Sequence, residues 1–528
     1  MTRRMRFNSQ PHLFALFVVI FCTAASNLAA QDTDRPVPYN IAFAVGYEHT
    51  LRSDELLFED TTKTYKNGID IQRNYFEELP LADLTIEGGS ACEGENGFGI
   101  AGQVKIKPEW SGNYFLSNNL PIANGEASVE GNLFSRSVVY WKSPSFGIAF
   151  GRDQVDYNGI LEGGLLASAR LPWLDALRGY GILGRFRLDS MIATIPAVKA
   201  WDNNDITPEP GYGFGTDPVT GTDTDTDPYA TTIVEAMSKI GWHFGPEQGP
   251  GMFTLSLADH AMLARYQNRF YLTDLFPFIS RHQASIPQTN NSMVISLHWQ
   301  PFPWMQVAGQ AGYDDINLNP VGVSDTGTPT IDAYAVAMKL NFPLSKSVGF
   351  DTENKGLHSD ISQSLEVYLE GGYTHWLWGN YDGTQAHPND VNYFLRFIYR
   401  YPRYLGGSIL LPLTSPYGPG VVWVQSHGTF NIEGKLLNQS AHLALGYRFL
   451  FLDMNSEANL IDTEVYDNTT TEEAARSYAV RVSLPISLTY GSIFSTIEPA
   501  YLWRDGLSAF ELDLSIACRL DVSSGSEL

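Results

Sequence analysis

Hydrophobic and polar residues alternate over long stretches of this chain. In residues 292–316 (SMVISLHWQPFPWMQVAGQAGYDDI), Met293, Ile295, Leu297 and Trp299 alternate with polar or small residues as far as a Pro-rich turn, after which the alternation resumes. Successive side chains of a β-strand point to opposite faces of the sheet. The pattern therefore predicts two strands joined by a tight turn, each with one apolar face.

The same alternation recurs along the chain. It is present in residues 39–48, 332–342, 364–373, 393–401, 442–451, 477–484 and 509–522. Strands of soluble sandwiches usually contain about five or six residues, whereas a membrane-spanning strand needs about 9–11. The run at 509–522 is of the longer kind, which is typical of a strand that crosses a membrane.

The second face of these strands indicates what the apolar face contacts. It is rich in Gly, Ala, Ser and charges of both signs, which is typical of a barrel lumen, whereas the outer face of a soluble β-protein is rich in Lys. In a bilayer, all backbone polar groups must be paired within the protein, so spanning strands form closed barrels. We therefore predict an all-β transmembrane antiparallel barrel of about 16–18 strands; a secreted all-β protein is the alternative.

Long polar segments separate many of the expected strands. Barrels of this class have short periplasmic turns and long outer loops, so we expect outer loops at 196–231, 258–291, 314–331 and 376–391. On this assignment, residues 343–363 form an unusually long inner connection.

Two stretches lack the alternation. Residues 162–179 and 257–284 have a composition compatible with helices, although Pro172 and Pro277 interrupt them. We expect either a few short helices that plug or flank the barrel, or loops that pack against it.

The first 30 residues have the features of a secretory signal peptide: three arginines, a short apolar run and small residues at its end. Residues 31–528 are then expected to form a single outer-membrane barrel domain. Without the three arginines this part has 31 basic and 58 acidic residues, a formal charge of 31 − 58 = −27, which offers no footprint for nucleic acid. Cys92 and Cys518 remain, and they form either one disulfide or two unpaired thiols.

Catalytic motifs are absent from the sequence: it has no G-x-S-x-G, no H-E-x-x-H, no paired C-x-x-C and no phosphate loop. The alternating carboxylates of Asp223, Asp225 and Asp227 resemble the start of a calcium loop. The required Gly and the distal Glu are missing, so a solvated acidic loop is favoured. We expect neither a cofactor nor a bound metal.

Two dipeptides that contain aspartate would suit a protease on the outer membrane surface. They are Asp259-His260 and Asp314-Asp315. Because neighbouring residues on a strand point to opposite faces, neither pair converges on one site. We therefore expect that the protein is not an enzyme.

Charged residues on the polar face of the expected strands are the main candidates for a functional role. They are Glu366, Glu370, Arg396, Arg400, Arg481, Glu498, Glu511, Asp513, Arg519 and Asp521. In an open channel these charges would set selectivity for small solutes. In a closed interior they would cross-link the wall, since buried charges require partners. Both interpretations stay open.

A second set of candidates lies in the expected outer loops among Asp, Asn and Gly. It comprises the aromatic residues Trp201, Tyr212, Phe214, Tyr229, Trp376 and Trp378. Aromatic faces beside polar groups suit carbohydrate binding, because sugar C–H faces stack on rings while hydroxyls need polar partners. Anchoring in the aromatic girdle of a membrane barrel explains the same residues equally well.

Residues 146–172 (FGIAFGRDQVDYNGILEGGLLASARLP) resemble the Wzi-type capsule assembly family of outer-membrane barrels. The matching positions are Gly151-Arg152, Gly163-Gly164, Leu165-Leu166, Ser168, Ala169 and Pro172. The resemblance implies a monomeric barrel of about eighteen strands with helices at its periplasmic end. It also implies a non-catalytic role in attaching or organising surface polysaccharide, with outer-membrane lipid and that polysaccharide as partners. A porin-like channel for small solutes is the alternative.

Overall fold

The structure is a computed structural model. It describes residues 38–53, 79–91, 96–108, 119–120, 122–123, 126–127, 134–168, 173–195, 232–246, 249–265, 289–315, 330–345, 362–375, 378–379, 398–402, 408–436, 439–455 and 476–523. These residues contain strands, turns and irregular segments, and none of them is helical. Within these ranges, no helix is long and apolar enough to cross a membrane.

Eighteen antiparallel strand positions form one closed sheet. The first nine strands are β1 (Tyr39–Arg52), β2 (Ala82–Gly88), β3 (Gly97–Ile106), β6 (Phe134–Lys142), β7 (Phe146–Asp153), β8 (Leu174–Leu183), β9 (Phe186–Ile195), β10 (Thr232–Phe244) and β11 (Met252–Arg265). The others are β12 (Thr289–Phe302), β13 (Met305–Asp315), β14 (Ile331–Ser345), β15 (Ser362–Thr374), β18 (Val421–Leu436), β19 (Gln439–Asn455), β20 (Arg476–Ser483), β21 (Ile486–Tyr490), β22 (Ile493–Arg504) and β23 (Leu507–Ser523).

β20 and β21 occupy a single position in the sheet. Both pair with β19 on one side and with β22 on the other. The interruption falls at Leu484 and Pro485, and proline cannot donate a hydrogen bond to a neighbouring strand. The Pro485 carbonyl still accepts from the Gly446 N–H at 2.7 Å, so the ladder is locally broken without opening the wall.

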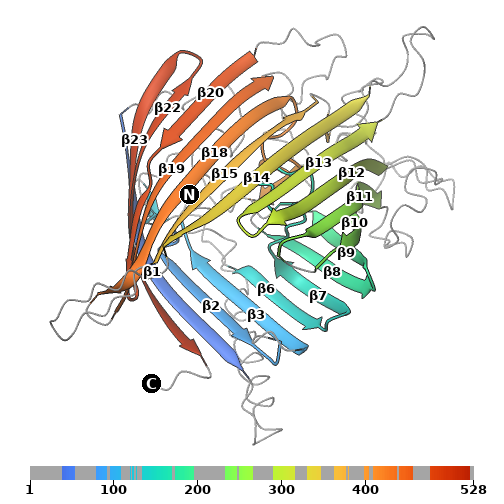
Figure 1. The fold of residues 1–528 in the computed structure, drawn as a ribbon, viewed down its shortest axis with the longest axis horizontal. Helices are drawn as coiled ribbons and strands as arrows, with labels where there is room; N and C mark the ends of the chain where they lie inside the picture. The colour runs from blue at the N-terminus through green and yellow to red at the C-terminus, as the bar shows by residue number, and fades with distance from the viewer. Residues whose placement is uncertain are drawn as a thin grey trace, which may run out of the picture.

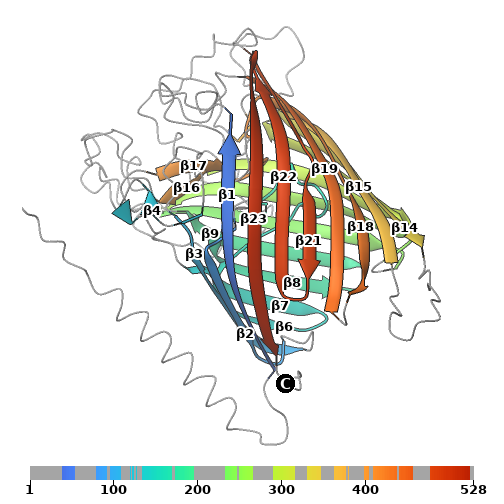
Figure 2. The ribbon, with the colours of Figure 1, turned by 90° about the vertical axis from the view of Figure 1, so that its left-hand side faces the viewer.

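The first and last strands close the sheet into a barrel. β1 pairs with β23 along its length, from Asn40 opposite Ser523 to Arg52 opposite Glu511. Figure 2 shows these two strands side by side and running in opposite directions. Figure 1 shows the tilted strands that make up the wall around the interior. Closure leaves this sheet without a free edge, as a membrane-spanning sheet requires.

The outer face of the wall is apolar. Along β23, Phe510, Ile516 and Leu520 are 66%, 55% and 59% exposed, while Glu511 and Asp513 on the opposite face are buried. The same division holds on β1, where Ile41, Phe43 and Val45 are exposed and the alternate Ala42 is buried. This arrangement confirms the predicted class, a transmembrane antiparallel β-barrel.

The two ends of the barrel differ in their connections. Both ends of the described chain and most of the short turns, such as those between β6 and β7 and between β8 and β9, lie at one end, whereas the turn at Asp505 and Gly506 between β22 and β23 lies at the other. The four predicted outer loops lie mostly outside the described residues, and each follows a strand that ends at the opposite end of the barrel; residues 258–265 and 289–291 belong instead to β11 and β12. That this end faces outward stays a prediction. The long connection between β14 and β15 falls at the short-turn end, as predicted.

The expected short helices and one expected barrel strand differ from the structure. In the two helix-compatible stretches, residues 162–168 are irregular, and residues 174–183 and 257–265 belong to strands β8 and β11. The expected short helices are thus not found in the described part of the chain. The described part of the alternating run at 393–401 is not in the barrel wall: β16 (Ile398–Pro402) pairs with β17 (Ser408–Pro412) in a separate hairpin. A second small hairpin pairs β4 (Ile122–Ala123) with β5 (Glu126–Ala127).

Cys518 gives a direct test of what contacts the outer face, because its side chain is exposed there opposite Val45. A nitroxide label on Cys518, with Cys92 changed to Ser, is expected to collide with dissolved oxygen more often than with a water-soluble nickel chelate. The reason is that oxygen partitions into hydrocarbon and the chelate does not. Electron paramagnetic resonance in proteoliposomes measures both accessibilities.

The matched control moves the label by one residue. Ala517 lies on the inner face of the same strand, so a Cys518→Ser, Ala517→Cys variant is expected to lose the preference for oxygen. Equal accessibilities at both positions would mean that the outer face is not covered by hydrocarbon.

Candidate functional site

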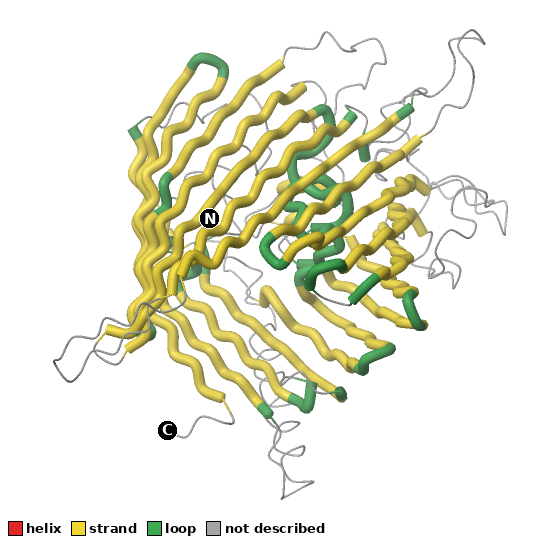
Figure 3. Tube along the Cα trace, in the orientation of Figure 1, coloured by secondary structure: helices red, strands yellow, loops and turns green. Residues whose placement is uncertain are grey.

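The connection between β7 and β8 crosses the lumen. Residues 154–168 of this connection, called the lumen segment below, are irregular and contact strands on the far side of the barrel. β7 is the fifth and β18 the fourteenth of the 18 strand positions, so the contacts with β18 lie opposite the point where the segment starts. Figure 3 shows loop segments between the walls of the barrel.

The buried carboxylate of Glu370 on β15 holds the middle of this segment. It accepts hydrogen bonds from the N–H groups of Glu162 and Gly163, each at 2.7 Å, and from the indole N–H of Trp423 at 2.8 Å. The Tyr368 hydroxyl also donates to it. A hydrogen bond to a charged group contributes about 1.5–3 kcal/mol, so the two bonds donated by the segment favour its inward position. Tyr368 and Trp423 hold the carboxylate in place from the wall.

Gly163 is required at this contact. A Cβ atom at this position would overlap the Glu370 carboxylate and would lie 2.7 Å from the indole nitrogen of Trp423. The segment approaches the wall through backbone alone, and the two N–H groups reach the carboxylate for that reason.

Two amide side chains and one lysine fix the remainder of the lumen segment. The Asn158 side chain accepts from the Leu166 N–H at 2.9 Å and donates to the Leu166 carbonyl at 2.8 Å, which closes the segment on itself. Gln310 on β13 accepts from the Leu165 N–H at 2.7 Å. Lys239 on β10 donates to the Tyr157 carbonyl at 2.8 Å. The segment is thereby tied to strands on three parts of the wall.

Burial raises the pKa of the Tyr157 phenol in this segment, and the negative charges of Asp189 and Glu235 raise it further.

A second connection fills the lumen from the other side. The described residues between β15 and β18 include Trp378, Leu413 and Tyr417, all at most 2% exposed. Together with Leu165 and Trp423 they belong to one buried apolar cluster. The Tyr417 and Trp423 rings lie 5.2 Å apart, and the Trp378 indole donates to the Thr414 hydroxyl at 3.2 Å. The centre of the lumen is therefore a packed core.

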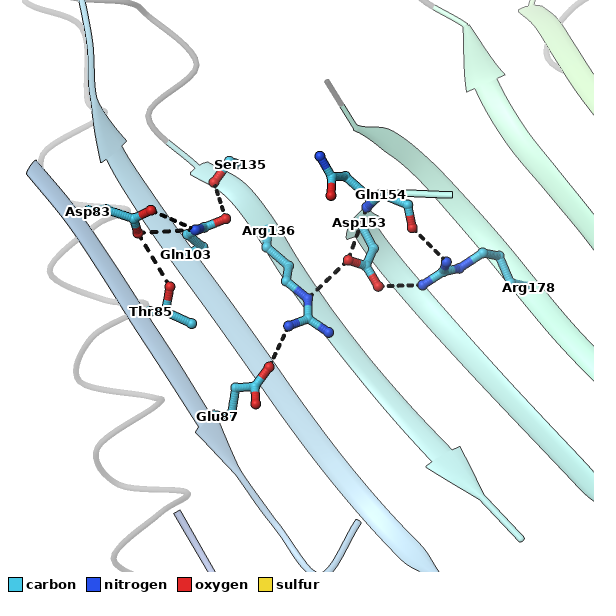
Figure 4. Close-up of polar contacts among 9 residues, drawn as sticks. All are labelled: Asp83, Thr85, Glu87, Gln103, Ser135, Arg136, Asp153, Gln154 and Arg178. Atoms are coloured by element: carbon cyan, nitrogen blue, oxygen red, sulfur yellow. Dashed lines mark hydrogen bonds and ion pairs between the residues drawn. The ribbon is translucent and has the colours of Figure 1, made fainter. Parts of the chain in front are cut away.

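Polar side chains on the inner face of β2 to β8 hold the start of the lumen segment, as Figure 4 shows. Arg136 pairs with Glu87 at 2.5 Å and with Asp153 at 2.9 Å. Asp153 also pairs with Arg178, whose second nitrogen donates to the Gln154 carbonyl at 2.9 Å. The chain leaves β7 at a point where acidic and basic side chains neutralise one another.

Four of the predicted lumen charges form a buried cluster beside the barrel seam. Arg481 on β20 lies 3.4 Å from Glu498, 3.1 Å from Glu511 and 3.7 Å from Asp513. Arg52 of β1 pairs with Glu511 across the seam at 2.9 Å. The side chains of all five residues are at most 10% exposed. Charges this deeply buried are retained only when paired, so here the cross-linked wall is favoured over a selectivity filter.

The inner wall is more open towards the short turns. Glu366 pairs with Lys339 at 3.7 Å, and the two side chains are 41% and 42% exposed. Arg519 and Asp521 pair at 2.9 Å near the end of β23 with about half of each side chain exposed. His427 pairs with Glu162 of the lumen segment at 2.8 Å. This half of the wall has the polar, accessible character expected of a wet lumen.

Several predicted residues lie elsewhere than expected. Arg400 belongs to the separate β16–β17 hairpin, so it is not on a barrel strand, and Arg396 is outside the described residues. Trp378 is 1% exposed and points into the packed core, so it presents no face to a sugar. The other loop aromatics, Trp201, Tyr212, Phe214, Tyr229 and Trp376, lie outside the described residues, as do Asp223, Asp225, Asp227 and Cys92.

The acidic dipeptides form no common site. Asp259 and His260 are neighbours on β11 and point to opposite faces, and His260 pairs with Glu235 at 2.6 Å on the inner side. Asp314 accepts from the Gly379 N–H at 3.0 Å, which ties it to the second lumen connection. Among the described residues, no group of three or more His, Cys, Asp or Glu side chains is placed to hold a metal ion.

Sequence reasoning found Glu370 but missed its partners. Tyr368 and Trp423 stand on expected strands and look like ordinary wall residues. The Gly163–Gly164 pair was the sequence feature that could have indicated this contact, because paired glycines in an otherwise apolar stretch indicate close backbone approach.

The fold and the lumen together define an outer-membrane β-barrel with an occupied interior. No protein-family model matches the sequence, and no curated protein matches it either. Among solved structures, the chain is similar to Wzi from Escherichia coli, described as a carbohydrate-binding β-barrel involved in group 1 capsule assembly. The identity is 11% and the TM-score 0.45, over 95% of this chain and 87% of Wzi.

Porins of Pseudomonas aeruginosa align in a similar way. OccK3 (OpdO) is 7% identical with a TM-score of 0.41, over 95% of this chain and 99% of its own. OccD3 (OpdP) is 11% identical with a TM-score of 0.39, over 92% and 91%. At these identities the similarity concerns the barrel fold alone.

The seam cluster predicts a large stability effect at one position and a small effect at another. Glu511→Gln removes the carboxylate that pairs with Arg52 across the seam and one of the three that pair with Arg481, so it should lower the free energy of unfolding by about 3 kcal/mol. Asp521→Asn on the same strand breaks an exposed pair and should cost less than about 1 kcal/mol. Denaturant titration of the detergent-solubilised barrel, followed by tryptophan fluorescence, measures both values. Equal losses would contradict the assignment of a buried cross-link at the seam.

Proposed function

We propose that this chain is a non-catalytic protein of the bacterial outer membrane that attaches or organises surface polysaccharide, and that it does not conduct solutes in its resting form. The observation that carries the proposal is the lumen segment, which crosses the barrel and is fixed at Glu370 by buried hydrogen bonds. A wall of 16–18 strands leaves an aqueous channel unless its interior is filled. A filled interior suits a protein whose ligand stays on the outside.

Aromatic and polar residues that suit a glycan occur in one of the long connections, at the end of the barrel opposite most of the short turns (the long-connection end). Trp201, Tyr212, Phe214 and Tyr229 lie in a connection that joins β9 and β10 at this end, within a sequence rich in Asp, Thr and Gly. Rings beside carboxylates and hydroxyls match the two needs of a sugar, stacking and hydrogen bonding. The lumen segment is also the stretch in which the sequence resembles the Wzi-type family.

Binding of surface polysaccharide tests the proposal directly. The detergent-solubilised barrel is expected to bind polysaccharide purified from the surface of the producing bacterium, measured by isothermal titration calorimetry. Trp201→Ala is expected to weaken binding at least fivefold, since loss of one stacked ring costs about 1 kcal/mol or more.

Trp242→Ala serves as the matched control, because Trp242 is exposed on the outer face near the short turns. The proposal also predicts that deleting the gene strips polysaccharide from cells without changing the uptake of small solutes. No binding by the purified barrel, together with intact surface polysaccharide on the deletion strain, would refute it.

One observation favours a porin-like channel as the second candidate. The inner wall towards the short turns carries half-exposed charges, including Lys339, Glu366 and Arg448. A polar, accessible wall of this kind serves a channel if the lumen segment moves aside.

Planar-bilayer conductance distinguishes the two candidates. The native barrel is expected to give no stepwise conductance. Gly163→Ala should produce conductance steps, because the added Cβ displaces the Glu370 carboxylate and releases the lumen segment. Glu370→Ala should do the same by removing the acceptor of four donors.

Gly102→Ala is the control for these variants, since a Cβ there has no heavy atom within 4 Å. It is expected to remain silent. Steps from the native protein, with an ion selectivity altered by Glu366→Gln, would instead establish the porin-like function.

A further inference from the structure

An open groove of about 640 Å³ indents the outer face of the barrel over β11 to β15. Gly309 and Ala311 of β13 form its floor. The wall on one side carries Ile295 and Leu297 of β12, and the ridge on the other carries Tyr334 and Val336 of β14. In the strand register, Gly309 lies directly between Leu297 and Val336, and the absence of a side chain at this position deepens the groove.

The fold does not require glycine at position 309. A Cβ there would meet only the Ala335 carbonyl oxygen, at an ordinary contact distance of 3.7 Å. Gly312 on the inner face of the same strand differs, because a Cβ there would overlap the Trp378 ring. Gly312 is therefore explained by packing inside the lumen, whereas the gap at Gly309 leaves room for something outside the protein.

The groove has a polar end towards the long connections. Tyr313 and Tyr334 stand there with their rings at 87° and their hydroxyl oxygens 3.5 Å apart. Tyrosine hydroxyls are typical of the membrane–water interface, where they contact head groups. From these hydroxyls the groove runs into the apolar band, where Val336 and Ile295 are 58% and 48% exposed.

We infer that this groove binds an acyl chain of one membrane lipid, with the head group at the Tyr313 and Tyr334 hydroxyls. The lipid belongs to the leaflet on the side of the long connections. Three observations agree: the groove is apolar, it is continuous with the outer face of a membrane-spanning wall, and its one polar end lies where a head group would be. The site is independent of polysaccharide binding and of the state of the lumen.

Native mass spectrometry of the full-length barrel in detergent tests this site, with dipalmitoyl phosphatidylethanolamine as the probe. One lipid is expected to stay bound under activation that removes the detergent. Gly309→Leu should reduce the bound fraction about tenfold by filling the groove, and Ala311→Leu should act in the same direction. Dihexanoyl phosphatidylethanolamine has the same head group and should bind at least tenfold more weakly, because its chains are too short to fill the groove.

Gly102→Leu is the matched control. Gly102 is on the outer face of β3, on the other side of the barrel, and a Cβ there meets no heavy atom within 4 Å. This variant should keep the lipid, and the heat-dependent mobility of every variant in gels shows that it is folded. Equal retention by Gly309→Leu and the native barrel would overturn the inference. So would a dimer that Gly309→Leu abolishes, because the groove would then be a contact between two copies of the chain.

Discussion

The pairing of every backbone polar group in a medium without water is the constraint on which this structure depends. Hydrocarbon supplies no partner for an unpaired N–H or C=O, so a sheet within a membrane must close on itself. β1 and β23 meet this requirement by pairing from Asn40–Ser523 to Arg52–Glu511. Closure also determines which kinds of side chain suit each face of a strand, because one face contacts lipid and the other is enclosed. The Arg52–Glu511 pair on the enclosed face reinforces the seam.

Closure of 18 strands creates an interior too wide for wall side chains to fill. The chain resolves this differently in the two halves of the lumen. In the centre, two connections from the long-connection end fold inward and build a core around Leu165, Trp378 and Trp423. Towards the short turns, the wall keeps half-exposed charges such as Glu366 and Lys339. The Glu370 carboxylate lies at the boundary, where it supplies the acceptors that the irregular backbone of the lumen segment needs.

The strands of the wall could be predicted from sequence because the alternation that marks them involves residues that are close together in the chain. Alternation along β12, β13 and β23 reflects two different media on the two faces of one strand, and a period of two records this directly. Alternation does not say which sheet a strand joins, so 393–401 was wrongly assigned to the wall when part of it forms the β16 hairpin. The inward contacts were beyond sequence reasoning for another reason. Gly163 meets Glu370 across 207 residues of chain, and the Trp378 indole donates to Thr414 across 36.

The filled lumen is fixed to the strand ends from which its two connections leave. Both connections that fill the interior begin and end at the end of the barrel opposite most of the short turns. Displacing the lumen segment would break the two hydrogen bonds that the Glu162 and Gly163 N–H groups donate to Glu370, while Tyr368 and Trp423 would still donate to the carboxylate. Each of the two lost bonds contributes about 1.5–3 kcal/mol. The buried hydrogen bonds at Glu370 therefore hold a cross-linked interior that resists opening. Such resistance suits retention of a polymer at the surface better than passage of a solute, because passage needs a lumen that opens at little cost.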